Sequence, residues 1–387
     1  MLRRSLAIGA VCASALLGGQ LATGASAATP TTSASHHRVS YPADSLRALG
    51  ARVGLRIGAA INTDQLGTDA AYTKLAGEQF STVTPENVMK WQLVEPTRGT
   101  YDWAAADRLV AFARAHGQLV RGHNLVWHSQ LPTWVSTDGG KTSPLSNAEL
   151  RALLKKHVQD EVRHFKGKIW QWDVVNEAFN EDGTPRQDIW YKAFGGTSYI
   201  ADAFRWAHQV DPKAELFYND YNIEFTGPKS NGVYTFVKSL KAQHVPISGV
   251  GFQTHLDTQY PFPDLQNNLK RFAALRLDVA ETEVDVRTFT NYPTAPNTPT
   301  DKLAPAAQSD YWSQALQACL AVQRCISFTA WGIGDANSWV PTTFKGEGAA
   351  LLFDEQLQPK QEYAVVQQDL ALASGAPHRH GKGAGRS

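Results

Sequence analysis

Eight short, apolar, β-rich stretches recur along the chain, and stretches with the periodicity of amphipathic helices lie between them. The β-rich stretches are residues 56–61, 81–87, 118–127, 168–177, 214–222, 247–256, 277–286 and 325–335. The clearest helical patterns are residues 103–117, 147–167 and 262–276. Alternation of strand and helix is typical of parallel βα units, and eight such units are the number that closes a barrel. The sequence therefore predicts the α/β class, with one (β/α)8 TIM barrel as a single domain.

Each predicted strand begins with apolar residues and ends with polar or aromatic ones. In residues 168–177, for example, apolar side chains up to Val175 are followed by Asn176 and Glu177. Because barrel enzymes carry their sites at the C-terminal ends of the strands, we expect these residues to meet at one mouth. Strict alternation would send Asn176 and Glu177 to opposite faces of the sheet. We therefore expect a bend or bulge at the end of this strand.

The composition limits the classes of ligand. The 387 residues are 43% hydrophobic and 19% charged, with a formal net charge of +1. A charge this close to zero gives no attractive field for nucleic acid or for an anionic membrane, so neither is an expected partner. The 11 Trp residues are many for this length. Since indole rings are costly to bury and well suited to stacking, we expect some of them to face a ligand.

The N-terminal residues have the pattern of an export signal. Arg3 and Arg4 precede the apolar residues 5–19, and residues 25–27 read Ala-Ser-Ala, a typical cleavage site. The apolar stretch is short for a membrane anchor. We predict a signal peptide at 1–27, secretion to the extracellular space and no membrane association after cleavage. A flexible polar lead at 28–42, the catalytic domain at 43–373 and a disordered Gly-rich tail at 374–387 follow.

Two cysteines remain once the signal peptide is removed. Cleavage eliminates Cys12 and leaves Cys319 and Cys325, six residues apart. In an exported protein we expect these two to form a structural disulfide. His123 and His128 have poor spacing for a shared metal ion, so we predict no metal site and no cofactor. We expect a monomer.

The polar groups at the strand ends indicate sugar chemistry. Cleavage of a glycosidic bond needs one carboxylic acid that protonates the leaving oxygen, and a second carboxylate that attacks the anomeric carbon or activates water. Indole rings stack on the apolar faces of pyranose rings, whereas amides and imidazoles bind the hydroxyl groups. Carboxylates, amides, imidazoles and indoles are the groups found at these strand ends.

Seven segments, in this order and spacing, resemble glycoside hydrolase family 10, the retaining endo-β-1,4-xylanases. They read VTPENVMKW, VRGHNLVWHSQLPTWV, WDVVNEAF, FYNDYN, GVGFQTHL, ETEVD and WGIGDANSW. The resemblance runs from about residue 50 to 370. It implies a retaining endo-β-1,4-xylanase that acts on xylan or its oligosaccharides through a covalent glycosyl-enzyme intermediate.

The resemblance also implies a role for each matching residue. Glu177 would be the general acid/base and Glu283 the nucleophile, with His255 and Asp285 orienting and polarising Glu283. Asn176 would bind the 2-hydroxyl of the sugar at the cleaved bond. The other implied substrate contacts are Gln253, His123 and Trp127 around the same sugar, Glu86, Asn87, Lys90 and Gln130 around the next sugar on the non-reducing side, Trp331 and Trp339 as a roof, and Tyr221 as a platform on the leaving-group side.

Three features depart from the family pattern. Asn124 stands where Thr is usual. Glu281 stands where an aliphatic residue is usual, and alternation would place it on the same face as Glu283 and Asp285. The motif favours Glu283 as the nucleophile. The third departure is a long insert at residues 287–310, which affects the expected substrate range and subsite shape more than the chemistry.

Two alternative functions remain open. A member of the same family could cleave another β-glycoside, such as the sugar chain of a plant saponin or glycoalkaloid. A barrel of this kind could also bind sugar without cleaving it, although the presence of both Glu177 and Glu283 disfavours that hypothesis.

Overall fold

The eight β-rich stretches form a closed parallel barrel in the computed structural model, which describes residues 40–290 and 304–375. The barrel strands are β1 (Arg56–Ile61), β2 (Thr82–Pro85), β3 (Leu119–Val126), β4 (Gln171–Asn176), β5 (Glu215–Asp220), β6 (Gly249–Phe252), β8 (Asp278–Phe289) and β9 (Cys325–Ala330). Each pairs in parallel with the next, and β9 pairs with β1, which closes the sheet. The predicted (β/α)8 barrel is confirmed.

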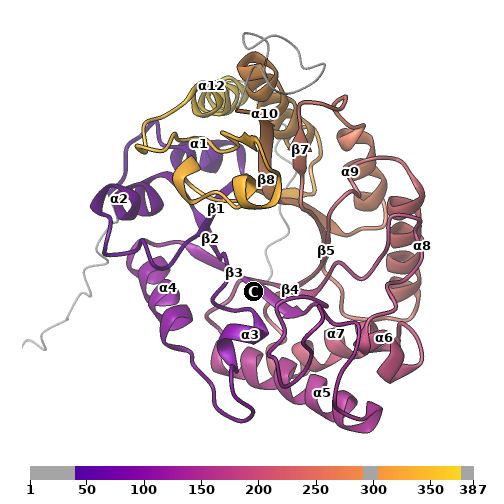
Figure 1. Ribbon diagram of the computed structural model, residues 1–387. Helices are drawn as coiled ribbons and strands as arrows, with labels where there is room; N and C mark the ends of the chain where they lie inside the picture. Colours follow the sequence, from indigo (N-terminus) through magenta and orange to yellow (C-terminus); the bar gives the residue numbers. More distant parts are fainter. Residues whose placement is uncertain (1–39, 291–303, 376–387) are drawn as a thin grey trace, which may run out of the picture. The chain divides into compact units, whose positions relative to one another are not determined.

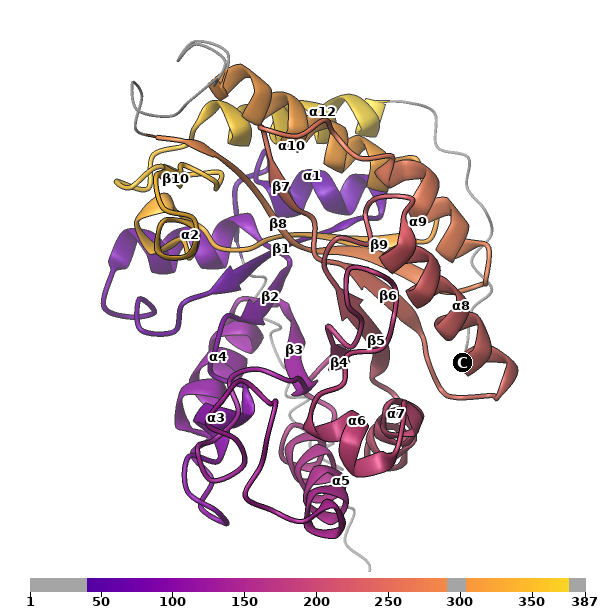
Figure 2. The ribbon, with the colours of Figure 1, turned by 45° about the vertical axis from the view of Figure 1, so that its right-hand side comes forward.

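Helices surround the barrel, as Figures 1 and 2 show. The longer ones are α1 (Leu46–Val53), α2 (Ala70–Gln79), α4 (Ala104–Ala115), α5 (Asn147–His164), α7 (Ser198–Val210), α8 (Pro228–Ala242), α9 (Leu265–Ala273), α10 (Ala304–Leu320) and α12 (Gln361–Gly375). Shorter elements are α3 (Trp91–Val94), α6 (Ile189–Phe194), α11 (Val340–Thr343), and the strands β7 (His255–Asp257) and β10 (Glu347–Gly348), which pair with the outer part of β8. The three predicted helical patterns correspond to α4, α5 and α9.

Local sequence signals explain where these elements begin and how closely they pack. Helix α5 begins at a capping box, in which the Ser146 hydroxyl accepts from the Glu149 N–H (3.3 Å) and the Glu149 carboxylate accepts from the Ser146 N–H (2.9 Å). Between β3 and β4, a Cβ at Gly122 would lie 2.3 Å from the ring of Trp172. Only glycine therefore lets this buried indole pack against β3.

A buried ion pair occupies the interior of the barrel. The Arg121 guanidinium of β3 donates to the carboxylate of Asp173 on β4 through Nε and through its second terminal nitrogen. Its other terminal nitrogen donates to the Thr282 carbonyl of β8 (2.8 Å). Burial of an ion pair carries a desolvation cost, and full hydrogen bonding offsets it here. Arg121 thus links β3 and β4 to a strand on the far side of the barrel.

The end of β4 deviates from regular strand geometry, as the sequence predicted. The register with β5 shifts between Asp173 and Val175, and Glu177 has a left-handed backbone with φ of 58°. The alternation of faces therefore stops before Glu177, and the side chains of Asn176 and Glu177 both reach the mouth of the barrel. The predicted bend is confirmed.

The prediction that Glu281 shares a face with Glu283 is wrong. In the pairing of β8 with β9, an extra β8 residue lies between Glu281 and Val284, which is a β-bulge. The bulge resets the alternation, so that the carboxylate of Glu281 lies within 4.8 Å of the Cys319 and Cys325 sulfurs. Glu283 turns to the opposite side and contacts the residues of the barrel mouth.

Cys319 at the end of α10 and Cys325 at the start of β9 form a disulfide, so the predicted pairing is confirmed. The predicted signal peptide at 1–27 lies outside the described residues, and so do most of the lead at 28–42, residues 291–303 of the insert and residues 376–387 of the tail. The predicted domain limits, 43 and 373, fall close to the start of α1 at Leu46 and the end of α12 at Gly375. Among the described helices, none combines the length and the apolar character that a bilayer crossing requires.

Candidate active site

A cleft of about 620 Å³ lies at the C-terminal ends of the barrel strands. It brings together Glu177, Glu283 and all the side chains that the sequence assigned to substrate: Glu86, Asn87, Lys90, His123, Trp127, Gln130, Asn176, Tyr221, Gln253, His255, Trp331 and Trp339. Asn222, Arg287 and Phe344 also line it and were not predicted. Asp285 lies just behind the cleft, in contact with His255 and Trp339. The volume is in the range of small-molecule sites.

Glu177 is held by neutral N–H donors. One carboxylate oxygen accepts from the Trp127 indole (2.8 Å), and the other accepts from the side-chain amides of Asn176 (3.2 Å) and Gln253 (3.1 Å). The backbone is fixed as well, because the Glu177 N–H donates to the Asn219 carbonyl (2.9 Å). The half-buried carboxylate is therefore oriented toward the cleft.

Glu283 is buried and surrounded by positive groups. Its Oε1 accepts from the Asn219 amide (2.8 Å) and lies 3.9 Å from the Arg121 guanidinium, while its Oε2 lies 3.3 Å from Nε2 of His255. Burial alone would raise the pKa of Glu283, but the hydrogen bond from His255 and the charges of His123, His255 and Arg121 outweigh it. The pKa of Glu283 is lowered to about 2. This carboxylate is therefore ionised throughout the ordinary pH range.

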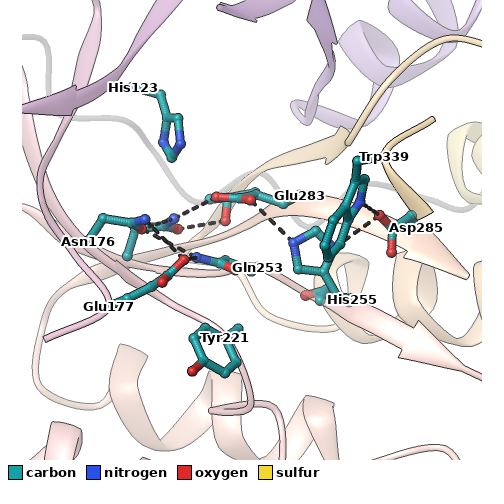
Figure 3. Close-up of polar contacts among 12 residues, drawn as sticks. His123, Asn176, Glu177, Tyr221, Gln253, His255, Glu283, Asp285 and Trp339 are labelled. Atoms are coloured by element: carbon teal, nitrogen blue, oxygen red, sulfur yellow. Dashed lines mark hydrogen bonds and ion pairs between the residues drawn. The ribbon is translucent and has the colours of Figure 1, made fainter. Parts of the chain in front are cut away.

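His255 lies between two carboxylates, as the right-hand part of Figure 3 shows. Its Nε2 faces Glu283, and its Nδ1 lies 3.0 Å from Asp285. Burial opposes a charged imidazole, yet the charge and hydrogen bonding of Asp285 and Glu283 raise the pKa of His255 to about 10. Asp285 also accepts from the Trp339 indole (2.7 Å). Trp339 is thereby linked through Asp285 to His255 and Glu283. The two carboxylates thus favour the charged form of His255 beside Glu283.

Asn219 is a central site residue to which the sequence assigned no role. Its side-chain amide donates to Asn176 (2.8 Å) and to Glu283 (2.8 Å), and its oxygen accepts from the Thr282 hydroxyl (2.7 Å). One buried carboxamide therefore connects the residue beside Glu177 with Glu283. The only sequence signal was its position in the polar end of a predicted strand, next to Asp220.

The predicted contacts on the non-reducing side form a connected polar group. Asn87 accepts from Lys90 (3.0 Å) and Gln130 (3.3 Å) and donates to Glu86 (3.4 Å). Burial raises the pKa of Glu86 and lowers that of Lys90, although the nearby carboxylates partly oppose the second shift. The Lys90 ammonium also lies 5.0 Å from the centre of the Trp127 ring. These side chains hydrogen-bond to one another and present both donors and acceptors to the cleft.

The predicted leaving-group platform, Tyr221, is held by two cations. The Lys229 ammonium lies 3.2 Å from the centre of the Tyr221 ring, and Arg186 donates to the Tyr221 hydroxyl (3.4 Å). Lys229 is itself buried and paired with Asp220 (3.1 Å) and Glu181 (2.9 Å). The Tyr221 ring thus packs against a cation whose charge is balanced by two carboxylates.

The described residues contain one group of three side chains with the spacing of metal ligands: Glu281, Cys319 and Cys325. Since the two cysteines form a disulfide, their sulfurs are not thiolates.

The chain is similar to proteins of known family over most of its length. The model of glycosyl hydrolase family 10 matches residues 45–369. The chain belongs to this family. It is a glycoside hydrolase by this membership, and the match covers the whole barrel.

Several members of the family are similar over most of their length. An endo-1,4-beta-xylanase of Agaricus bisporus is 42% identical over 324 residues, which cover 83% of this chain and 93% of that protein. Endo-1,4-beta-xylanase C of Phanerodontia chrysosporium is 42% identical over 312 residues, covering 80% and 74%. The crystal structure of xylanase 10B from Thermotoga petrophila in complex with xylobiose superposes with a TM-score of 0.79 at 39% identity, covering 85% of this chain and 98% of that one.

Proposed function

We propose that this protein is a retaining endo-β-1,4-xylanase in which Glu283 is the nucleophile and Glu177 the general acid/base. The observation that carries the proposal is the contrast between two glutamates in one cleft. Glu283 is buried against His255 and Arg121, which hold it ionised, whereas Glu177 meets only neutral donors at its oxygens. The xylanase names of the relatives and the xylobiose of the Thermotoga petrophila complex support xylan as the substrate.

The reaction proceeds in two displacements. In the first, a Glu283 oxygen attacks the anomeric carbon while Glu177 gives its proton to the glycosidic oxygen, and the leaving sugar departs. In the second, Glu177 takes a proton from water, whose oxygen attacks the same carbon and releases Glu283. Two inversions at one carbon give net retention. The product is a shortened chain whose new reducing end has the β configuration.

The surrounding residues prepare Glu283 for this attack. His255 and Asn219 each contact a different oxygen of the carboxylate, so its orientation is set before substrate arrives. Asn176 donates to Glu177 and accepts from Asn219 and Gln253, which places its amide between the two glutamates. Figure 3 shows Asn176 on one side of Glu283 and His255 on the other. An amide at this position is suited to bind the 2-hydroxyl of the sugar, a contact that strengthens in the transition state.

The role of Glu177 is tested by the dependence on leaving group. Glu177→Ala should retain much of its kcat/KM on aryl xylobiosides with acidic phenols, which depart without protonation, and should lose far more on xylan. Its kcat on the aryl substrates should fall, because the second step lacks its base. Azide should restore activity to Glu177→Ala and yield a β-glycosyl azide, because a small anion replaces water in the second step. Equal losses on both kinds of substrate would show that Glu177 is not the acid.

The substrate is tested by product analysis on xylan, on xylo-oligosaccharides and on a plant saponin glycoside. We expect internal cleavage of xylan, and nuclear magnetic resonance should detect the β-anomer first at the new reducing end. Release of sugar from the saponin with none from xylan would instead favour the alternative β-glycosidase.

We also propose that the protein is secreted. Residues 1–27 have the charge, apolar stretch and small residues of an export signal, and a disulfide such as Cys319–Cys325 persists in oxidising compartments. Mass spectrometry of the protein recovered from the medium should give Ala28 as the first residue. A product that stays in the cell and begins at Met1 would contradict this.

A further inference from the structure

The carboxyl group of Glu281 plays no part in the proposed reaction. It lies on the outer face of β8, beside the end of α10, where it is 0% exposed. Its two oxygens make no hydrogen bond to any described residue. Buried polar groups in folded proteins are nearly always hydrogen-bonded, and one that is not often marks the place of an ion or a water molecule. The groups around Glu281 therefore indicate what its carboxyl group can bind.

Two sulfur atoms are the nearest candidate partners for a shared ligand. Helix α10 packs against β8 and β9 (Figure 2) and carries Cys319 at its end, whereas Cys325 begins β9. A Glu281 oxygen and the two sulfurs all lie within 4.8 Å of one another. In a tetrahedral zinc site, with bonds of about 2.3 Å to sulfur and about 2.1 Å to oxygen, the ligand atoms lie about 3.6 to 3.8 Å apart. The three atoms are close to this spacing.

A backbone oxygen lies beside the same two sulfurs. In the pairing of β8 with β9, one extra β9 residue follows Cys325, which forms a second bulge. The Ser327 carbonyl oxygen in this bulge lies 3.8 Å from the Cys319 sulfur and 3.9 Å from the Cys325 sulfur. It is placed to take the fourth position of a tetrahedral site.

The sulfurs can bind a metal only when the disulfide is broken. A dithiol reductant breaks the S–S bond by becoming a disulfide itself, and its two protons leave Cys319 and Cys325 as thiols. A divalent cation then displaces both thiol protons, and the proton of Glu281 where that carboxyl group is protonated. Thiolate ligands favour Zn²⁺ over the harder Ca²⁺ and Mg²⁺. Two thiolates and one carboxylate carry three negative charges, of which Zn²⁺ neutralises two.

The reduced chain can keep its fold and admit an ion. The disulfide closes a loop of few residues, so its reduction adds little entropy to the unfolded chain. Strand β9 stays paired with β1 and β8 through its backbone. Residues 321, 323 and 324, between the two cysteines, are exposed, and Cys325 is 7% exposed. Reduction thus frees two thiols beneath a short surface loop.

We propose that the reduced protein binds one Zn²⁺ through Glu281, Cys319 and Cys325, with the Ser327 carbonyl as the fourth ligand. Metal and disulfide compete for the same sulfurs, so oxidation releases the ion. The ion supplies the partner that the Glu281 carboxyl group lacks in the oxidised protein. A site with four protein ligands is structural, and this one is independent of the cleavage of xylan.

The test compares the reduced and oxidised forms of the full chain carrying Cys12→Ser, in which Cys319 and Cys325 are the only cysteines. Dithiothreitol reduces the protein, and gel filtration without oxygen removes the reductant. Titration with Co²⁺, a coloured substitute for Zn²⁺, should give the visible bands of a tetrahedral site and a sulfur-to-cobalt charge-transfer band in the reduced form alone. Native mass spectrometry should find one Zn²⁺ more on the reduced chain than on the oxidised chain.

Substitutions in the same Cys12→Ser chain separate the ligands from other buried groups. Glu281→Gln keeps the size of the side chain and removes the carboxylate. Its Kd for Zn²⁺ should rise at least about 100-fold, because changes to groups behind the ligands already cost about 10- to 100-fold. Glu161→Gln is the matched control, since Glu161 is also 0% exposed but lies on α5 beside His157 (3.3 Å), outside this group. Its Kd should stay within about twofold.

A second measurement follows the return of the disulfide. Zn²⁺ should slow the reoxidation of the reduced protein by oxidised glutathione at least about tenfold, because bound thiolates are not free to attack. Cys325→Ser serves if Glu281→Gln does not fold, and it should weaken both the charge-transfer band and the binding of Zn²⁺. Absence of the cobalt bands from the reduced protein, equal binding by the oxidised form, or an unchanged Kd in Glu281→Gln would overturn the proposal.

Discussion

Glu281 and Glu283 lie on the same strand, two residues apart, and both are buried, yet their surroundings are opposite. Glu281 is 0% exposed, its carboxyl oxygens make no hydrogen bond to any described residue, and its pKa is raised well above the usual value by burial and by Glu224. Glu283 is 4% exposed and contacts Asn219, His255 and Arg121, and its pKa is lowered to about 2.

The difference shows that burial does not decide the charge of a carboxyl group. Removal from water disfavours the ionised form at both positions. Only Glu283 has a cation and an amide donor at its oxygens, and these reverse the effect of burial. A nucleophile therefore depends on the groups that the barrel brings to it from β3, β5 and β7, and a carboxylate on the other face of β8 has none of them.

The largest expected effect is the loss of activity when Glu283 is changed. Glu283→Gln removes the attacking oxygen but keeps the size of the side chain, so kcat should fall at least about 10⁴-fold on any substrate. Glu281→Gln is the matched control and should keep activity within about twofold. Rates on an aryl xylobioside measure both, and comparable losses in the two variants would remove the distinction between the two glutamates.

A smaller effect is expected when the cation beside Glu283 is removed. His255→Asn leaves a neutral side chain, so the pKa of Glu283 should rise from about 2 toward its ordinary value. Because attack needs ionised Glu283, the acid limb of kcat/KM should move to higher pH. At neutral pH the loss of the donor should lower kcat about 10²-fold.

The pH profile of kcat/KM on an aryl xylobioside checks this prediction. His244→Asn is a suitable control, since His244 is exposed and its φ of 54° is one that asparagine tolerates. An acid limb that stays in place in His255→Asn would mean that His255 does not set the ionisation of Glu283.

The smallest effect on activity, and a gain in stability, is expected from Glu281→Met. Methionine has a similar size and no polar atoms that need partners, so the free energy of unfolding at pH 4 should rise by about 1 kcal/mol. The pKa of Glu281 is higher in the folded protein than in the unfolded chain, where it is about 4.5. The wild type therefore loses stability as the pH rises from the unfolded-state pKa to the folded-state pKa. Over that window the advantage of Glu281→Met should grow by about 1.4 kcal/mol per pH unit.

Urea unfolding of wild type and Glu281→Met at several pH values measures this difference, and activity should remain at the wild-type level. A variant that is less stable than wild type, or an advantage that does not change with pH, would show that the Glu281 carboxyl has a stabilising partner.

The barrel itself could be predicted because its signals are local. Each strand is an apolar stretch of a few residues and each helix has its own period, so eight units could be counted without knowledge of their contacts. The need for a bend at Glu177 also followed from alternation. Its form did not, since the φ of 58° is held by contacts with residues outside the strand: Arg186 donates to the Glu177 carbonyl (3.0 Å), and the Asn219 carbonyl accepts from the Glu177 N–H.

The parts of the site that escaped prediction depend on long-range pairing. Nothing in the segment FYNDYN distinguishes Asn219, which bridges Asn176 and Glu283, from the other polar residues around it. The face of Glu281 was predicted wrongly because the bulge in β8 arises from the register with β9. Such a register is decided by how two strands pair, and the residue types of one strand do not record it.

The pairing of β9 with β1 closes the barrel, so the last strand neighbours the first. The order of the strands around the barrel would therefore stay the same if the chain began at a different strand. The same closure brings helices α1 and α12 together, so that Gln367 donates to the Asp44 carbonyl (2.8 Å) just before α1. A circular permutant, joined from the end of α12 to the start of α1 and opened in the turn between α5 and β4, would retain every parallel strand pair. Its first barrel strand would then be the one that carries Asn176, and the two glutamates would still face one cleft.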